Sequence, residues 1–437
     1  MLRREFIKSG ALVGGALVSP IPLFAKEEKI KLAILGTGWW GTDILLNNAL
    51  ASGQFEIIGL CDVDSLALKN AAAIAVKAGG KEPKLFSDYR QMYEMPGLQA
   101  VAIATPTHWH ALQFIAACNK GLHVFLEKPI SYDIREGQAM LNAHRKAKNV
   151  VQVDFPRVMV DTNDKVKAFI QSGEAGKILQ VQANINNPEG PVVEKPIPAT
   201  IDFETFCGPA PRQKFLSAEA NIKSNWRAQH EFSRGIFADW GIHYIHNLRK
   251  VLDLGIPDSV SAVGGTVHNF THDHPDQLDV RFDFAGLPVY WTHKTWGYTS
   301  PQPDYDIGVF YFGEKATIFA GDLGWEVFPK EGSKKTNGSV RFEPWKPENE
   351  AIYAKMMVDM FNEFAGGIRK KSNSGISNTL EDAQKTTSSV IYGDMAYLTK
   401  SNLVIDKSTM EVKNNKEAQA MLKRNYRAPY KHPWTAV

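Results

Sequence analysis

The sequence has very little cysteine. Its three cysteines, Cys61, Cys118 and Cys207, are scattered through 437 residues, which excludes a small disulfide-stabilised fold. An excess of charge of one sign is also missing, because 50 lysines and arginines nearly balance 47 aspartates and glutamates. A net charge of +3 gives no electrostatic basis for binding nucleic acid. What remains is the composition of an ordinary globular protein, long enough for two domains.

A hydrophobic run long enough to span a membrane is absent as well. The apolar run at residues 10–18 is too short and too rich in glycine. It follows Arg3 and Arg4 in a segment that resembles a twin-arginine export signal, although Leu2 stands where serine or threonine is usual. We therefore expect residues 1–25 to be a signal peptide and the protein to be periplasmic.

The first feature that carries chemistry is a glycine-rich turn. A buried strand is predicted at residues 29–35 and a helix at residues 42–51, with GTGWWG at residues 36–41 between them. Gly36 allows a tight turn, Gly38 lets a pyrophosphate approach the backbone, and Gly41 permits close packing. The helix N-terminus then faces the phosphates. This arrangement predicts a dinucleotide-binding unit.

An acidic residue ends the next strand. That strand is predicted at Phe55–Cys61, and Asp62 follows it, 21 residues past Gly41. A carboxylate there accepts hydrogen bonds from the adenosine ribose and repels a 2′-phosphate, which favours NAD over NADP. A further buried strand, at residues 101–104, leads into Thr105 and Pro106, and strand ends are where ligands bind in such sheets.

Five motifs together identify a family resemblance. GTGWWG, CDVD, ATPTHWH, HVFLEKP and ADWGIHYIH resemble the Gfo/Idh/MocA family of oxidoreductases (glucose–fructose oxidoreductase and inositol dehydrogenase), over nearly the whole chain after residue 29. The resemblance implies an NAD-binding Rossmann domain, with a doubly wound parallel sheet, at residues 29–154. It also implies an α/β domain with an open, mostly antiparallel sheet at residues 155–437. Members mostly oxidise or reduce one hydroxyl carbon of a sugar or cyclitol, while a minority cleave glycosides through transient oxidation.

The second domain shows several strand and helix patterns. Residues 278–284 alternate apolar and polar side chains, which predicts a half-buried strand. The other predicted strands lie at residues 177–185, 260–267, 288–295 and 308–319. Helices are predicted at residues 163–172, 236–254, 352–368 and Leu380–Leu398, with a loop at residues 188–211 and a polar C-terminal tail.

Three residues suit hydride transfer from an alcohol. Lys128, at a strand end beside the cofactor, is expected to stabilise the developing alkoxide. Asp239 and His243 lie one helical turn apart on one face, and the carboxylate is expected to orient the imidazole and favour its protonated form. The resemblance implies that His243 is the proton acceptor and that Asp239 is its partner or a substrate ligand.

Further residues are assigned to cofactor and substrate. The predicted cofactor contacts are Gly36, Thr37, Gly38, Trp39, Trp40, Gly41, Asp62, Thr105, Pro106, His110, Glu127 and Lys128. The predicted substrate contacts are Arg157, Trp226, Arg227, His230 and His246. Seven of the ten tryptophans lie in the second domain, where an aromatic face can stack on a sugar or simply fill a core.

No metal is expected. His272 and His274 in one loop could hold an ion, but no third ligand is evident from the sequence. The favoured function is an exported oxidoreductase that oxidises C3 of a glycoside with a tightly held NAD, because a periplasm has no ready pool of free nucleotide. The alternatives are an NAD-dependent glycosidase and a non-enzymatic sugar-binding protein. We expect a small carbohydrate substrate and a homo-oligomer.

Overall fold

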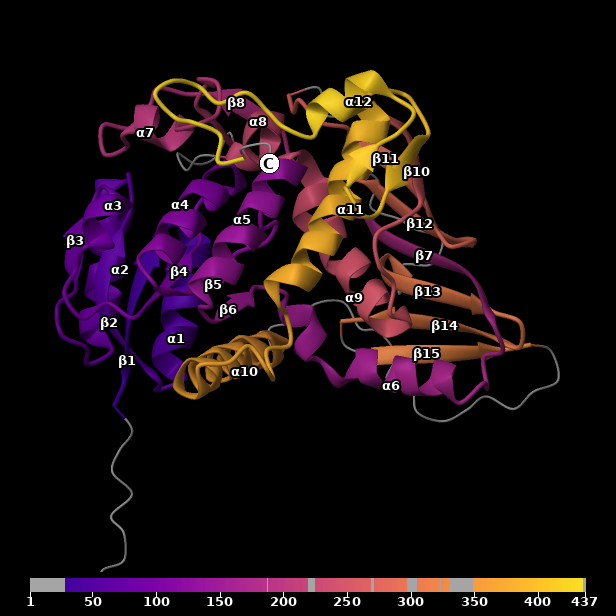
Figure 1. Ribbon diagram of the computed structural model, residues 1–437, viewed down its shortest axis with the longest axis horizontal. Coiled ribbons are helices and arrows are strands. Elements are labelled where there is room, and N and C mark those ends of the chain that lie inside the picture. The colour runs from indigo at the N-terminus through magenta and orange to yellow at the C-terminus, as the bar shows by residue number, and fades with distance from the viewer. Residues whose placement is uncertain are drawn as a thin grey trace, which may run out of the picture.

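The computed structural model describes residues 28–186, 188–218, 225–268, 271–296, 305–322, 324–330 and 349–434 (Figure 1). It contains two large sheets, one in each half of the predicted division, and a two-stranded sheet. Within these residues, no helix combines the length and the apolar character needed to cross a membrane. The predicted signal peptide lies outside the described residues.

The N-terminal sheet has six parallel strands in the order β3-β2-β1-β4-β5-β6. This is the strand order of a Rossmann fold, which confirms the predicted fold class. The strands are β1 (Ile30–Leu35), β2 (Phe55–Cys61), β3 (Lys84–Phe86), β4 (Ala100–Ile103), β5 (His123–Leu126) and β6 (Val151–Val153). The helices between them are η1 (Trp40–Leu46), α1 (Asn47–Ala51), α2 (Ser65–Lys77), α3 (Tyr89–Met92), α4 (Thr107–Asn119) and α5 (Ile134–Ala147).

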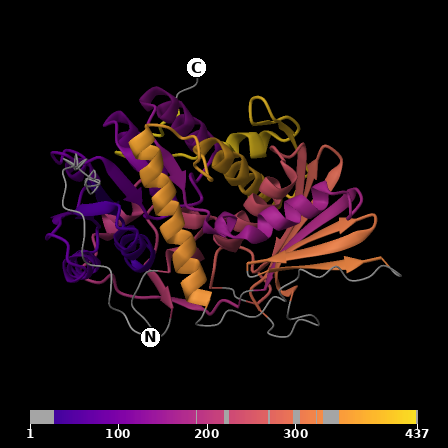
Figure 2. The same ribbon diagram turned by 90° about the horizontal axis from the view of Figure 1, so that it is seen from below.

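A helix from the far end of the chain completes this first core. Helix α10 (Asn349–Lys370) lies along the N-terminal sheet, as Figures 1 and 2 both show. Its Phe361 stacks on Phe125 of β5 with ring centroids 4.4 Å apart, and contacts Phe55 of β2 edge-on. All three rings are buried. One face of the nucleotide-binding sheet is therefore covered in part by residues that follow β15 of the second sheet.

The second sheet has nine strands in the order β15-β14-β13-β7-β12-β11-β10-β16-β17. All neighbours are antiparallel except β7 and β12. The strands are β7 (Ile178–Asn186), β10 (Ser259–Gly265), β11 (Gln277–Phe284), β12 (Leu287–Lys294), β13 (Ile307–Gly313), β14 (Ala316–Gly321), β15 (Gly324–Pro329), β16 (Leu403–Asp406) and β17 (Glu411–Val412). This open, mostly antiparallel sheet is as predicted.

Helices cover one face of the second sheet (Figure 1). They are α6 (Asp161–Gln171), η4 (Phe237–Gly241), α9 (Ile242–Leu252) and α11 (Leu380–Leu398), whereas η2 (Pro156–Met159) packs against α10 and α9. Val181, Ala183 and Ile185 of β7 are buried, while Gln182 and Asn184 point to the other face. The alternation places polar side chains on the face that these helices leave uncovered.

Some boundaries differ from those predicted. Residues 308–319 form two strands, β13 and β14, because the chain turns at Glu314 and Lys315. The predicted loop at residues 188–211 contains β8 (Val192–Glu194) and α7 (Phe203–Cys207). The predicted tail contains β16, β17 and α12 (Lys416–Met421). The remaining elements, between α7 and η4, are strand β9 (Leu216–Ala218), η3 (Trp226–Ala228) and α8 (His230–Ser233).

Candidate functional site

The glycine-rich turn has the geometry that a bound pyrophosphate requires. Gly36 has φ of +90°, and a Cβ there would lie 2.7 Å from the carbonyl carbon of Ala104. A Cβ at Gly41 would collide with the carbonyl oxygen of Gly36, whereas one at Gly38 would meet nothing within 4 Å. The turn is thus packed tightly on the protein side and open at Gly38. Helix η1 then starts as a π-helix, earlier than the helix predicted at residues 42–51.

Asp62 lies beside this turn, at the carboxyl end of β2. Its Oδ2 accepts hydrogen bonds from the backbone N–H of Thr37, at 2.5 Å, and from the Thr37 hydroxyl, at 3.1 Å. Its Oδ1 accepts from the backbone N–H of Asp64, at 2.8 Å. Burial raises the pKa of Asp62, against these hydrogen bonds. The carboxylate is therefore positioned by the turn itself, with Thr37 as the link.

A pair of buried carboxyl groups lies at the indole N–H of Trp40. The Trp40 N–H donates to Oε1 of Glu127 and, at 3.2 Å, to Oδ2 of Asp154. Burial and the neighbouring Asp154 raise the pKa of Glu127 well above its ordinary value. Burial and the charge of Asp154 therefore both disfavour the ionised form of Glu127. Sequence reasoning did not find Asp154, although its position directly after β6 is a strand-end signal like that of Asp62.

Lys128 joins the two halves of the molecule. Its Nζ donates to the backbone carbonyl oxygen of Asp239 at 2.7 Å and to Oδ1 of the same residue at 2.8 Å. The other carboxylate oxygen of Asp239 lies 3.0 Å from Nε of Arg227. Burial alone would raise the pKa of Asp239, but the charges of Arg227 and Lys128 hold it below its ordinary value. The carboxylate is thus ionised between two cations.

His243 does not pair with Asp239 as predicted. Both carboxylate oxygens of Asp239 are engaged by Lys128 and Arg227, and Nδ1 of His243 has no partner among the described residues. Burial, then the charges of Lys128 and Arg157, lower the pKa of His243 well below its ordinary value. The expectation that the carboxylate favours a protonated imidazole is therefore wrong. His243 is neutral, the state in which it can accept a proton.

His246 is part of the core rather than a substrate ligand. It has no exposed surface and stacks on Phe155, with ring centroids 3.9 Å apart. Its Nδ1 lies 2.8 Å from the Thr386 hydroxyl and its Nε2 lies 3.2 Å from Oδ1 of Asn378. Both ring nitrogens are therefore occupied by helix α11 and the segment before it. The predicted substrate contact is wrong because the His246 side chain points into the packing with α11.

His110 is buried between two of the predicted cofactor segments. Its Nδ1 lies 2.7 Å from the carbonyl oxygen of Pro129, and its Nε2 lies 2.7 Å from that of Thr105. Burial lowers the pKa of His110 to about 4. The ring braces the end of β4, before Pro106, against the segment that carries Lys128. This fits a positioning role rather than chemistry.

The other predicted substrate contacts lie around Asp239. Arg157 forms an ion pair with Asp322, with Nε 2.8 Å from Oδ2, and lies over the Trp240 ring. The Arg227 guanidinium stacks over the Trp226 ring at 4.4 Å. Trp39, which is 56% exposed, contacts Trp40 edge-on.

His230 belongs to a separate charged network. Its Nε2 lies 3.0 Å from Oδ2 of Asp394, which also accepts from Arg234. Its Nδ1 lies 3.4 Å from the hydroxyl of Tyr132. Sequence reasoning missed Asp394, which is buried in the middle of α11 and had no signal to separate it from a surface position.

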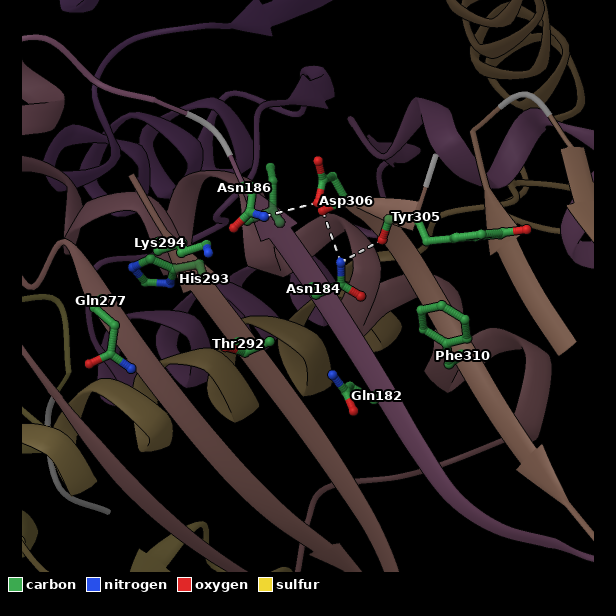
Figure 3. Close-up of a pocket in the computed structure, with 11 residues that line it drawn as sticks. Gln182, Asn184, Asn186, Gln277, Thr292, His293, Lys294, Tyr305, Asp306 and Phe310 are labelled. Atoms are coloured by element: carbon green, nitrogen blue, oxygen red, sulfur yellow. Dashed lines mark hydrogen bonds between the residues drawn. The ribbon is translucent and has the colours of Figure 1, made fainter. Parts of the chain in front are cut away.

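A polar hollow of about 370 Å³ lies on the uncovered face of the second sheet (Figure 3). Its side chains come from neighbouring strands and the segment before β13. Asn184 donates to the carbonyl oxygens of Tyr305 and Asp306, and Asn186 donates to the Asp306 carboxylate. It is lined by none of the residues predicted for cofactor, substrate or catalysis.

Sequence comparison matches both parts of the chain to one family. Residues 30–155 match the model described as an oxidoreductase family with an NAD-binding Rossmann fold. Residues 163–319 match the model of the GFO/IDH/MocA C-terminal domain. The N-terminal match covers the glycine-rich turn, Asp62 and Lys128.

Individual relatives share modest sequence identity with this chain. A glycosyl hydrolase family 109 protein of Stenotrophomonas maltophilia is 34% identical over 134 residues, which is 29% of this chain and 29% of that protein. The scyllo-inositol 2-dehydrogenase (NAD(+)) of Bacillus subtilis is 27% identical over 302 residues, 68% of this chain and 75% of the relative. The chain thus spans less than a third of the first relative's length. A solved levoglucosan dehydrogenase in complex with NADH and levoglucosan has the same fold, with a TM-score of 0.64 at 19% identity over 86% of this chain and 99% of that one.

Proposed function

The chain belongs to the Gfo/Idh/MocA family of oxidoreductases and has its NAD-binding Rossmann domain, and from this premise we propose that it oxidises a secondary hydroxyl group of a sugar or glycoside. The observation that carries the proposal is the cluster of Lys128, Asp239 and His243. It combines an ammonium, a carboxylate that fixes it, and a buried neutral imidazole. These are the groups that alcohol oxidation needs beside a hydride acceptor.

The roles follow from the contacts. NAD, when bound, supplies the hydride acceptor. The Lys128 ammonium, held by Asp239, donates a hydrogen bond to the substrate oxygen and stabilises the negative charge that develops on it. His243, whose imidazole is unprotonated, accepts the hydroxyl proton. Asp239 is a positioning residue for Lys128, and Arg227 keeps Asp239 ionised.

For the substrate, we propose a glycoside that is oxidised at C3 to a 3-keto product. Support comes from Trp226, Arg227 and Trp240, which place aromatic and guanidinium groups around Asp239. Aromatic faces stack on the C–H face of a pyranose. We also propose that the protein is exported to the periplasm with NAD held tightly, on the strength of Arg3 and Arg4.

The test is a single-turnover experiment on the purified protein. A panel of methyl and aryl glucosides and galactosides and of free inositols is mixed with the enzyme, and NADH absorbance is followed while the product is identified by NMR. A 3-keto glycoside supports the proposal. Reduction of NAD by inositols alone would overturn the glycoside assignment, and no reduction by any alcohol would overturn the dehydrogenase itself.

An NAD-dependent glycosidase is a second candidate, because of the 34% identity to a glycosyl hydrolase family 109 protein. In such a cycle, oxidation at C3 would acidify the C2 proton and allow elimination of the aglycone from C1. Water would then add at C1 of the unsaturated ketone, and return of the hydride from NADH to C3 would restore the hydroxyl group. An aryl glycoside separates the two functions. A glycosidase releases aglycone over many turnovers without an external electron acceptor, whereas a dehydrogenase stops after one reduction of its bound NAD.

A further inference from the structure

Two histidines of one loop and a glutamate of another come together away from Lys128 and its partners. Glu189 follows β7, and His272 and His274 lie in the segment between β10 and β11. One ligand-type atom of each residue lies within 4.8 Å of those of the other two. Both imidazoles are more than nine-tenths buried. The fold therefore supplies the third ligand that the His-x-His sequence pattern lacked.

Two buried polar atoms of this cluster are not satisfied by the protein, whereas Nδ1 of His274 lies 3.4 Å from the carbonyl oxygen of Pro275. Nδ1 of His272 lies 3.4 Å from Oε2 of Glu189, which is longer than an ordinary hydrogen bond. Within the described part of the chain, neither Oε2 of Glu189 nor Nε2 of His272 has a hydrogen-bond partner, and both atoms are buried. Such groups normally have a partner in the protein, a water or an ion.

The spacing suits a tetrahedral metal ion. Zinc binds imidazole nitrogen and carboxylate oxygen at about 2.0–2.2 Å, so neighbouring tetrahedral ligands lie roughly 3.4 Å apart. The separation of Glu189 Oε2 and His272 Nδ1 already has this value, and the ligand atoms of all three residues lie within 4.8 Å of one another. Two imidazoles and one carboxylate form a ligand set that zinc uses with a fourth, open position.

The loops that carry the ligands are fixed by other contacts. The backbone N–H of Glu189 donates to the carbonyl oxygen of Thr295 at 3.0 Å, and that of Val192 donates to the Thr271 hydroxyl at 2.9 Å. His274 packs against Gly235, where a Cβ would lie 2.5 Å from the imidazole Cγ. The ligands are thus held near one another before any ion binds.

A second cluster of the same residue types provides a contrast. Asp133, Glu136 and His432 also lie close together, but every carboxylate oxygen there has a donor. Asp133 accepts from the backbone of Glu136 and Arg424 and contacts His432, while Glu136 accepts from the backbone of Tyr132 and from the Tyr426 hydroxyl. That cluster fastens the C-terminal segment to α5 and needs no ion.

We propose that Glu189, His272 and His274 bind one zinc ion, or a similar divalent transition metal, independently of the NAD site. The ion would join the segment after β7 to the segment before β11. Asp273, between the two histidines, accepts a hydrogen bond from the backbone of His230 and donates its own N–H to Ala228 at 3.2 Å. The metal therefore stiffens the loop against the segment that carries Trp226 and Arg227.

The experiment measures metal content and does not depend on activity. Tag-free, full-length protein is treated with a chelator, dialysed and titrated with Zn²⁺, and bound zinc is measured by inductively coupled plasma mass spectrometry. We expect one zinc per chain and a higher melting temperature. Mg²⁺ and Ca²⁺ are expected to bind far more weakly, because they prefer all-oxygen sites.

Variants decide which residues bind the ion. Glu189→Gln, His272→Ala and His274→Ala should each weaken zinc binding by more than about tenfold, since even residues behind the ligands typically account for roughly 10–100-fold. His268→Ala is the matched control, because His268 is an exposed histidine of the same segment and should leave binding unchanged. Circular dichroism checks the folding of each variant.

If His272→Ala does not fold, Glu189→Gln and the absorption spectrum of the Co²⁺-loaded wild type remain decisive. Intense visible bands are expected for a tetrahedral site with nitrogen and oxygen ligands. Three outcomes would overturn the proposal: no zinc uptake by the wild type, equal affinity in Glu189→Gln, or tighter binding of Ca²⁺ than of Zn²⁺.

Discussion

Lys128 and Asp239 are 111 positions apart in the sequence, yet the lysine ammonium contacts both the side chain and the backbone carbonyl oxygen of the aspartate. Lys128 follows β5 of the nucleotide-binding sheet, and Asp239 lies in the π-helical turn η4 before α9. One side-chain cation therefore links the cofactor domain to the helix that carries His243. Changes at either residue should affect catalysis before they affect nucleotide binding.

Replacing Lys128 by Met should leave NAD bound but remove most substrate-dependent reduction. The variant keeps the glycine-rich turn and Asp62, whereas loss of a positioned polar group in the chemical step typically costs about 10²–10⁴-fold in rate. Single-turnover NADH absorbance measures the rate, and mass spectrometry of released nucleotide measures occupancy. Lys120→Met is the control, since Lys120 pairs with Glu94 on the surface of the same domain. A near wild-type rate in Lys128→Met would refute the assignment.

His243→Ala should reduce the rate by a similar factor at neutral pH. Its pKa lies well below 6.5, so the wild-type rate should show no loss from protonation of this residue until the pH falls into the acidic range. The pH profile of the single-turnover rate tests this point. An inflection near pH 6.5 that disappears in His243→Ala would contradict the buried, neutral state.

The free energy of unfolding should decrease as the pH is lowered, and this decrease should be smaller in His246→Gln. Burial lowers the pKa of His246 to about 3, from an ordinary 6.5, so the unfolded chain binds a proton that the folded chain does not. The contribution of this pKa difference to the free energy of unfolding is complete above pH 6.5. It is lost as the pH falls towards 3, by roughly 1.4 kcal/mol per pH unit. Urea unfolding of both proteins between pH 7 and 4.5 should give a shallower slope for the variant. Parallel curves would mean that His246 can be protonated in the fold.

The purified protein should carry NAD(H) rather than NADP(H). Asp62 lies beside the turn and is held there by Thr37, where a 2′-phosphate would meet a carboxylate. Asp62→Ser should weaken NAD binding and allow NADP to compete, as measured by titration of nucleotide-free protein. NADP as the sole occupant of the wild type would refute the ribose assignment.

Replacing Arg3 and Arg4 together by Lys should leave precursor in the cytoplasm, because the export machinery reads the arginine pair. Cell fractionation followed by immunoblotting gives the distribution. Exchange of Lys8 for Arg is a suitable control, since it lies outside the pair. Unchanged export of the double variant would remove the argument for a permanently bound nucleotide.

The sequence was sufficient for the nucleotide unit because its signals are local. The strand, the glycines, the helix and Asp62 follow one another along the chain, and each has its own steric or electrostatic reason. The partners of charged groups were not local. Arg227 reaches Asp239, and Glu189 reaches His272, only through the register of the second sheet and the packing of its loops.

The misassignment of His246 as a substrate contact has the same cause, a partner that is distant in the sequence. Helical spacing predicted that Asp239, His243 and His246 share one face, but it could not tell which neighbour each side chain would face. His246 faces α11, whose Thr386 supplies its hydrogen bond. No feature of the sequence near residue 246 indicates that helix.

The position of helix α10 has a consequence for the order in which the parts of the protein fold during translation. Phe55 and Phe125 of the nucleotide-binding sheet are covered by Phe361, so the layer that η1, α1 and α2 begin on this face stays incomplete until α10 has left the ribosome. Domains near the N-terminus generally fold first during translation. Here the core of the first domain includes a helix made after β15, and a ribosome-bound chain that ends before α10 should expose these aromatic rings to chaperones.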